Sequence, residues 1–201
     1  MTDPISTPAP ATLLVLAGGD SRRMGRPKAL LPVGDTTLIE WLVGRLAPAF
    51  EHVAVAARDP AQVPPGLRPR VVRDLHLDAG PLAGIEAGLA AAKQPTLVAV
   101  ACDMPYVSTA LAGRLAAAAI GRDAAVPRVG GRPQPACAAY RAGAAGPIAA
   151  ALGRGVRRAS EVLSELSVRW LEDEDPAQFA NLNTPADYEA FLKRLVRDPA
   201  N

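Results

Sequence analysis

The chain has 201 residues, of which 49% are hydrophobic and 21% are charged, with a formal net charge of +2. This composition is close to that of ordinary globular domains and excludes a wholly disordered chain. The balanced charge gives no reason to expect nucleic acid or an anionic membrane as a partner, since either would require a concentrated basic face.

The cysteine count and the ends of the chain bear on where the protein works. Two cysteines are too few for a disulfide framework, which favours a reducing compartment. The first residues are rich in proline and lack the basic and apolar segments of a signal peptide, and no apolar run reaches the ~18 residues of a membrane span. We therefore expect a cytoplasmic protein with a flexible Pro-rich tail at 1–11, a single domain at 12–197 and a short tail at 198–201.

Short apolar runs alternate with segments of helical periodicity along the rest of the chain. Strands are expected at 12–17, 52–56, 70–73, 96–102, 124–127, 136–140 and 168–171, and helices at 38–46, 82–92, 108–119, 142–152, 158–166 and 185–196. A polar loop is expected before Thr36, and either Thr36 or Thr37 is a suitable N-cap for the first helix. Ser108 is the expected N-cap of the third helix, and Gly84 and Gly88 are expected to break the second.

This alternation predicts an α/β fold with three layers, in which helices cover both faces of a mostly parallel sheet. In such sheets, ligands bind beyond the carboxyl ends of the strands. Gly18, Asp74 and Asp103 each come just after an expected strand. We therefore expect these three residues to line one crevice.

The loop after the first strand is the segment best suited to bind phosphate. From position 16 it reads Leu-Ala-Gly-Gly-Asp-Ser-Arg-Arg-Met-Gly-Arg-Pro-Lys, ending at Lys28. Gly18 and Gly19 allow a sharp turn whose backbone N–H groups approach an anion, while Arg22, Arg23 and Lys28 add positive charge. The spacing fits neither a P-loop nor the dinucleotide fingerprint. We interpret the segment as a phosphate-binding loop, and a solvated turn with scattered arginines is the alternative.

The aspartates at the strand ends are candidates for binding a metal ion or a nucleotide. Asp103 follows a buried strand, and a carboxylate facing a phosphate crevice is suited to Mg²⁺, which takes one or two carboxylates together with phosphate oxygens and water. The alternative role of Asp103 is to cap a turn or a helix. Asp74 has the same position after its strand, although Arg70 and Arg73 are possible ion-pair partners for it.

Several of these segments together resemble one family. The loop motif ending at Lys28, Asp74, Gly80-Pro-Leu-Ala-Gly84, Cys102-Asp103-Met-Pro105 and Asn181-Leu-Asn-Thr-Pro185 occur in the order typical of molybdenum cofactor guanylyltransferases, the MobA family. The first motif is shared with other nucleotidyltransferases, whereas the combination is more specific. The resemblance extends from about residue 12 to 192 and implies a Rossmann-type fold like that of the nucleotide-diphospho-sugar transferases.

The resemblance also implies an activity and a set of site residues. The enzyme would transfer GMP from GTP to molybdopterin and release pyrophosphate, with Mg²⁺ as cofactor. Residues implied to bind the nucleotide are Leu16, Ala17, Gly18, Gly19, Lys28, Asp74, Gly80 and Asp103, with Asp103 as the metal ligand, Lys28, Asp103 and Arg22 in catalysis, and Asn183 on the pterin side. Insertion proteins or apo-molybdoenzymes are the implied protein partners. The family often has Asn after the second strand, where this chain has Arg58, so that contact differs.

Two alternative functions are considered beside this one. A cytidylyltransferase of the sister family would use CTP, but its opening motif tends to read Leu-Ala-Ala-Gly, whereas this chain has two glycines at 18 and 19. A non-catalytic nucleotide-binding regulator on the same fold would be favoured by loss of the lysine or the metal aspartate. Both Lys28 and Asp103 are present, which favours an enzyme.

Overall fold

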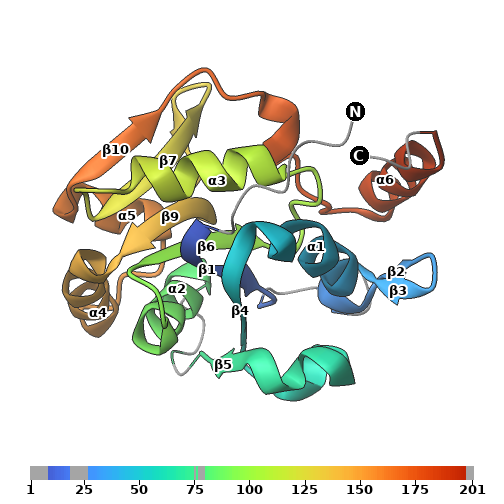
Figure 1. Cartoon of the computed structure of the whole chain (residues 1–201), viewed down its shortest axis with the longest axis horizontal. Helices are drawn as coiled ribbons and strands as arrows, with labels where there is room; N and C mark the ends of the chain where they lie inside the picture. Colours follow the sequence, from blue (N-terminus) through green and yellow to red (C-terminus); the bar gives the residue numbers. More distant parts are fainter. Residues whose placement is uncertain (1–8, 19–26, 75, 77–79, 198–201) are drawn as a thin grey trace.

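The computed structural model describes residues 9–18, 27–74, 76 and 80–197, which form a sheet with helices packed on both faces (Figure 1). The strands of the main sheet are β1 (Ala9–Leu16), β4 (Phe50–Ala57), β5 (Val71–Arg73), β6 (Thr96–Ala101), β7 (Ala124–Val129), β8 (Arg132–Pro133), β9 (Cys137–Arg141) and β10 (Val168–Leu171). A separate hairpin is formed by β2 (Pro32–Val33) and β3 (Thr36–Thr37).

The α-helices are α1 (Leu38–Leu46), α2 (Gly80–Ala91), α3 (Thr109–Ala118), α4 (Ala145–Gly153), α5 (Ala159–Val162) and α6 (Pro185–Arg197). Short 3₁₀ helices occur at η2 (Lys28–Leu30), η3 (Ala47–Ala49), η4 (Pro60–Gln62), η5 (Pro65–Arg70), η6 (Ala142–Ala144), η7 (Leu163–Glu165) and η8 (Pro176–Phe179).

The sheet has the order β10-β7-β9-β6-β1-β4-β5 with β8 added beside β7. β1 lies near its middle and pairs in parallel with β4 and β6, and β5 and β10 also pair in parallel with their neighbours. β9 is antiparallel to both β6 and β7. The predicted mostly parallel sheet is therefore confirmed, with the antiparallel β9 as an addition.

Two apolar layers enclose the sheet, which confirms the predicted three-layer arrangement. Successive side chains of β1 alternate between the faces: Leu13 and Val15 pack in the layer beneath α1 and α3, whereas Leu14 and Leu16 pack in the layer beneath α2, α4 and α5. This alternation follows from the two-residue period of a strand, and it lets an entirely apolar strand be buried on both sides.

The observed elements agree with most of the predicted ones and differ where no periodic pattern exists. The helix caps Thr37 and Ser108 are confirmed, since each side chain accepts a hydrogen bond from the backbone N–H three residues later. β1 begins at Ala9, so the strand takes in residues 9–11, which we expected to belong to the tail. The sequence did not indicate this start, because a proline lies between Ala9 and Thr12 and cannot donate a hydrogen bond to a neighbouring strand. The pairing of β1 with β4 also shifts its register between these two residues. The hairpin β2–β3 was also unpredicted, since two-residue strands have no period.

The predicted break of the second helix at Gly84 and Gly88 is wrong, because α2 runs through both positions. A Cβ on Gly84 would lie 2.9 Å from Leu16 Cδ2, and one on Gly88 would lie 2.5 Å from Leu14 Cδ2. The two glycines therefore let α2 approach β1 closely. Close approach to the sheet outweighs the low helix propensity of glycine.

We expect Gly88→Ala to destabilise the fold by about 1–2 kcal/mol, because Leu14 is fully buried and its displacement strains the core. In a chain of this length, that change lowers the melting temperature by about 2–8 °C. Gly44→Ala on the exposed side of α1 is the matched control, because nothing lies within 4 Å of the added Cβ. The control should be neutral or slightly stabilising. Equal melting temperatures for the two variants in calorimetry would contradict this account of α2.

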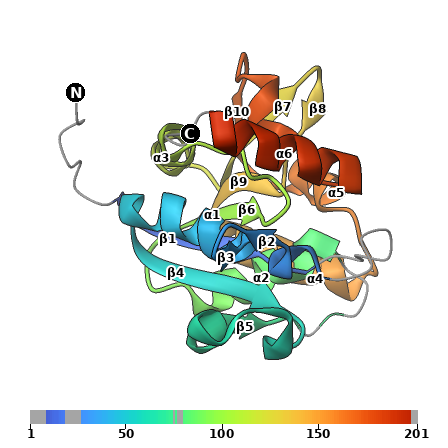
Figure 2. The same cartoon turned by 90° about the vertical axis from the view of Figure 1, so that its right-hand side faces the viewer.

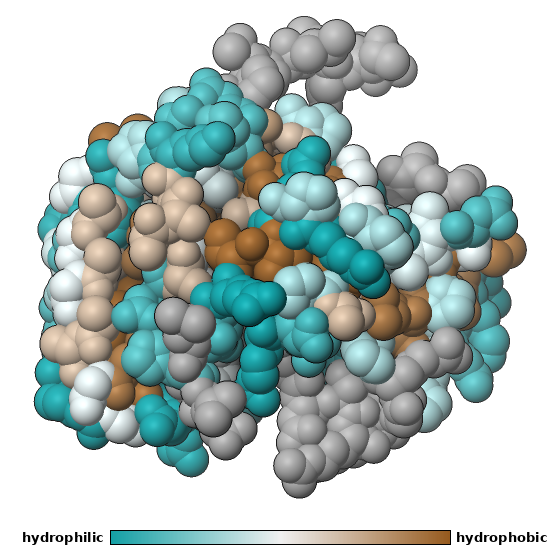
Figure 3. All heavy atoms as spheres, turned by 90° about the horizontal axis from the view of Figure 1, so that it is seen from below, coloured by the Kyte–Doolittle hydropathy of each residue, from teal (hydrophilic) through white to brown (hydrophobic). Residues whose placement is uncertain are grey.

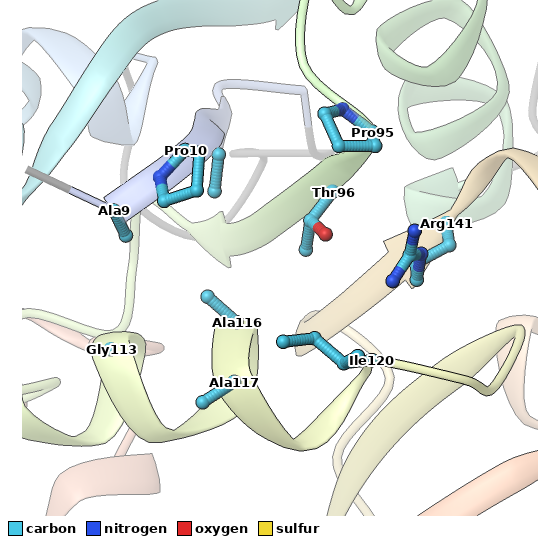
Figure 4. Close-up of a pocket in the computed structure, with 10 residues that line it drawn as sticks. Ala9, Pro10, Pro95, Thr96, Gly113, Ala116, Ala117, Ile120 and Arg141 are labelled. Atoms are coloured by element: carbon cyan, nitrogen blue, oxygen red, sulfur yellow. The ribbon is translucent and has the colours of Figure 1, made fainter.

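The two edges of the sheet differ in character. At the amino ends of β1 and β6, a cavity of about 310 Å³ is lined by Ala9, Pro10, Thr96, Ile120 and Arg141, among others (Figure 4). The carboxyl ends of β1, β4, β5 and β6 meet at the opposite edge, which is seen on the right in Figure 2. The three strand-end residues predicted from the sequence follow the carboxyl ends of these strands, so they lie at the edge opposite this cavity.

One face of the molecule shows a mixed surface. Seen from below, hydrophobic residues form separate groups among hydrophilic ones (Figure 3). Of the helices in the described part of the chain, none has the length and apolarity that crossing a bilayer requires.

Candidate active site

The three strand-end residues predicted to share a crevice do share one edge of the sheet. Backbone bonds continue beyond the strands there, with Ala17 N donating to Ala56 O (2.9 Å) and Cys102 N donating to Leu16 O (3.0 Å). Gly18 and Asp103 therefore leave adjacent strands side by side. Asp74 follows β5, which β4 separates from β1, so about 10 Å lie between those strand axes. An elongated ligand can span this edge.

Lys28 is the centre of the contacts at this edge. Its Nζ lies 2.8 Å from Asp103 Oδ2 and 2.9 Å from Asn183 Oδ1, so one ammonium group joins residues that are 75 and 155 positions away. The side chains of Lys28 and Asp103 are 17% and 23% exposed, so the pair is shielded yet accessible from solvent. The structure thus brings together a cation, a carboxylate and an amide that the sequence placed in three separate motifs.

Among the described residues, the side-chain contact of Asp103 is with Lys28, and no backbone N–H of a turn or helix donates to its carboxylate. The turn after β6 is closed by the backbone, with Met104 N donating to Ala101 O (3.0 Å), and Ser108 caps α3. The carboxylate is therefore left to interact with Lys28.

Asn183 is placed by the loop that leads into α6. Leu182 N donates to Asp103 O (2.8 Å), which docks the loop on the turn after β6. Asp187 Oδ2 accepts from the backbone N–H groups of Asn183 (3.0 Å) and Thr184 (2.8 Å). Hydrogen bonding to Thr184, and then to Asn183, lowers the pKa of Asp187. The amide of Asn183 is thereby fixed beside Lys28.

A third apolar cluster holds α6 and this loop against the rest of the molecule. Phe191 is fully buried and packs edge-on against Trp41 (5.1 Å between ring centroids) and Tyr106 (5.8 Å). The hydroxyl of Tyr188 donates to Pro32 O in the hairpin β2–β3. The unpredicted hairpin is therefore part of the support that positions Asn183.

Arg45 is a supporting residue that the sequence did not single out. Its Nη1 donates to Pro105 O (2.7 Å), and its guanidinium lies 4.6 Å from the ring centroid of Trp41. Burial lowers the pKa of Arg45. The side chain thus braces the turn that follows Asp103. An arginine four residues after a tryptophan on a helix, which places both on one face, was the available signal.

The phosphate-binding motif is described only in part. Ala17 is partly exposed and Gly18 is exposed at the end of β1. Leu16 belongs to the core, with a side chain only 4% exposed, so only its backbone remains for the predicted nucleotide contact. Gly19 and Arg22 lie outside the described residues, so their predicted roles stay predictions.

The start of α2 lies at the same edge. Gly80 has φ +57° and a Cβ there would lie 3.7 Å from Arg157 O, so this position requires glycine for its backbone conformation. Asp74 Oδ1 accepts a hydrogen bond from His76 N (3.0 Å), and His76 Nε2 lies 3.1 Å from Glu86 Oε2 in α2. The nucleotide contact predicted for Asp74 stays a prediction.

The two cysteines are packing residues, as predicted for Cys102. Both thiols are buried, and burial raises the pKa of Cys102 and of Cys137 to about 12. A thiol with that pKa is almost entirely protonated at neutral pH and is a poor nucleophile. Thiol chemistry is therefore no part of the site.

Comparison with known proteins agrees with this geometry. The family model described as MobA-like NTP transferase domain matches residues 13–170. The molybdenum cofactor guanylyltransferase of Cereibacter sphaeroides is 40% identical over 190 residues, which cover 92% of this chain and 97% of that protein.

Solved structures extend the comparison. Molybdopterin-guanine dinucleotide biosynthesis protein A from Archaeoglobus fulgidus has a TM-score of 0.78 at 29% identity, with 92% of this chain and 99% of that chain covered. The 2-C-methyl-D-erythritol 4-phosphate cytidylyltransferase of Thermus thermophilus has a TM-score of 0.69 at 25% identity, with coverage of 92% and 98%. One of these proteins is named for a guanine dinucleotide and the other for cytidylyl transfer, so the fold alone does not select the base.

Proposed function

Because the chain belongs to the MobA-like NTP transferase family, we propose that it transfers GMP from GTP to the terminal phosphate of molybdopterin, forming the guanine dinucleotide of the molybdenum cofactor. It is a nucleotidyltransferase. The observation that carries the proposal is the contact of Lys28 with Asp103 and Asn183 at the carboxyl edge of the sheet. A fold of this kind binds its ligand at that edge.

The transfer reaction requires neutralisation of the negative charge on the phosphates and does not require a strong general base. An oxygen of the acceptor phosphate forms the new bond to the α-phosphorus of GTP, and the bond from that phosphorus to the bridging oxygen breaks to release pyrophosphate. The acceptor is already an anion, so no proton has to be removed from it. Lys28 then stabilises the negative charge that accumulates on the leaving pyrophosphate, while the backbone at Gly18 helps to hold the phosphates.

The donor set at this edge fits a divalent cation of the Mg²⁺ type. In the described part of the chain, no three His, Cys, Asp or Glu side chains are grouped to hold a metal. Mg²⁺ does not need such a group, because it combines one or two carboxylates with substrate phosphates and water. The Asp103 side chain is 23% exposed at this edge, and we assign its carboxylate this role. When bound, the cation would shield the charge of the triphosphate.

The choice of nucleobase is tested directly with purified protein. We expect pyrophosphate release to require GTP and molybdopterin together, and GTP to bind more tightly than CTP or ATP in the presence of Mg²⁺. The expectation rests on the relatives named for guanylyl transfer and on the glycine at position 18, which has no Cβ to intrude on a ligand. Titration calorimetry with each nucleotide measures the preference. Tighter binding and faster turnover with CTP would move the protein to a cytidylyltransferase function.

We further propose a protein that receives the product, either an insertion protein or an apo-molybdoenzyme. The support is the chemistry of the product, because a molybdenum cofactor acts within an enzyme. Co-purification of the chain with a molybdoenzyme, dependent on added GTP and molybdopterin, is the test.

A further inference from the structure

The ammonium group of Lys28 contacts the carboxylate that the proposed function assigns to the divalent cation. Its Nζ is 2.8 Å from Asp103 Oδ2, the carboxylate oxygen that is engaged in the ion pair. We propose that Lys28 is the resident counterion of Asp103 and that it and a divalent cation exclude each other on this carboxylate. The inference rests on the proposed function, since that function puts the cation on Asp103.

Mutual exclusion follows from the distances involved. A divalent ion of the Mg²⁺ type binds a carboxylate oxygen at about 2.1 Å, closer than the ammonium group does. Both ions would then lie on one carboxylate within a few ångströms of each other, with three positive charges facing its single negative charge. Little solvent screens them, because the Asp103 side chain is only 23% exposed. Lys28 therefore has to leave Oδ2 when the cation arrives.

Of the two side chains in the Lys28–Asp103 ion pair, Lys28 is the one that moves when the cation binds. Asp103 and the loop carrying Asn183 are joined by the backbone bond from Leu182 N to Asp103 O (2.8 Å). Asp103 and Asn183, which both accept from the ammonium group, are thus fixed relative to each other. Lys28 starts the short helix η2, and its backbone is held by Leu31 N donating to Lys28 O (3.1 Å). Its four-carbon stem can turn without moving either partner.

The exchange has a functional consequence. While Lys28 neutralises Asp103, the protein without nucleotide holds a divalent cation weakly. A nucleotide supplies the negative charge that accepts the displaced ammonium group, so cation and nucleotide bind together. Lys28 is then released toward the phosphates at the moment when its charge is needed there.

Binding of Mn²⁺ to the nucleotide-free protein tests the exchange, with free Mn²⁺ measured by electron paramagnetic resonance. Lys28→Met keeps the length of the side chain and removes its charge, and we expect it to bind Mn²⁺ about ten-fold more tightly than the wild type does. Lys93→Met, at an exposed lysine, is the control and should leave the affinity unchanged. Adding Asp103→Asn to Lys28→Met should abolish the gain. Equal or weaker Mn²⁺ binding by Lys28→Met overturns the proposal.

Nuclear magnetic resonance of lysine gives a second readout on the unmodified chain. The sequence contains three lysines, Lys28, Lys93 and Lys193, so protein labelled with ¹³C at lysine Cε gives a simple spectrum. Addition of Mg²⁺ without nucleotide should shift the Lys28 signal and leave the other two in place, and Asp103→Asn should remove the shift. A Lys28 signal that stays unchanged at saturating Mg²⁺ contradicts the exchange.

These outcomes are separable from those of the proposed function. If the enzyme uses CTP, the base assignment fails while the Mn²⁺ and lysine measurements still report the exchange. If GMP transfer is confirmed and Lys28→Met gains no affinity for Mn²⁺, the exchange alone is wrong.

Discussion

Substitution of Asp103 by asparagine is expected to lower the rate of guanylyl transfer by at least about 10³, because in the proposed mechanism this carboxylate holds the cation that shields the phosphates. The protein should stay folded. The two hydrogen bonds that shape this turn, from Met104 N to Ala101 O and from Leu182 N to the carbonyl of Asp103, involve only backbone atoms. We therefore expect the effect in turnover and not in melting temperature.

Nucleotide binding separates this result from a general loss of the site. GTP should still bind to the Asp103→Asn protein without Mg²⁺, through Lys28 and the backbone at Gly18, and Mg²⁺ should add little to that affinity. Calorimetry with and without Mg²⁺, together with pyrophosphate release, measures both properties. A variant that turns over normally would remove the metal from Asp103.

A second aspartate provides the contrast of a structural carboxylate. Asp123 Oδ2 accepts a hydrogen bond from Ser167 N (2.9 Å) just before β7, at the other edge of the sheet. Asp123→Ala should lower the melting temperature and leave the Mg²⁺ dependence of turnover intact. If Asp103→Asn behaves in the same way, Asp103 is structural too.

Replacement of Lys28 by alanine is expected to lower turnover by about 10², which corresponds to about 3 kcal/mol of lost transition-state stabilisation. In the proposed mechanism, the lost charge is the one that stabilises the departing pyrophosphate. Stability should change far less, since the hydrogen bond that Lys28 O accepts from Leu31 N involves only backbone atoms and is kept in the variant. Turnover at saturating GTP and the melting temperature are the two measurements.

Lys93→Ala is the control for Lys28→Ala, because Lys93 is exposed and lies just after α2, away from the carboxyl edge. It should keep wild-type turnover. The proposed metal exchange predicts a second property of Lys28→Ala. The variant should bind Mn²⁺ more tightly than the wild type while it catalyses the reaction more slowly. Near-wild-type activity of Lys28→Ala would exclude this residue from the mechanism.

Much of the framework of the site could be predicted from the sequence alone. The strands β1 and β6 are continuous apolar runs, and their ends put Gly18 and Asp103 at one edge once the strands are taken as parallel. Ser108 was predicted as a cap from its residue type and position, and its side chain accepts from Leu111 N (3.1 Å). These features are local, because they depend on side-chain periodicity and on backbone groups three residues away.

Only the tertiary structure decided which side chains meet. Nothing in the local pattern indicated that the amide of Asn183 would lie 2.9 Å from Lys28, 155 residues earlier. Nor could the pattern show that Gly84 and Gly88 face the sheet, where helix propensity alone predicted a break. Both results depend on how helices pack in the folded protein. The position of Asn183 depends on the packing of α6 against its apolar cluster, and the role of the two glycines depends on the packing of α2 against β1. Contacts between distant segments leave no periodic pattern in the sequence. The candidate site residues could therefore be named from the sequence, but their contacts with Lys28 could not be predicted from it.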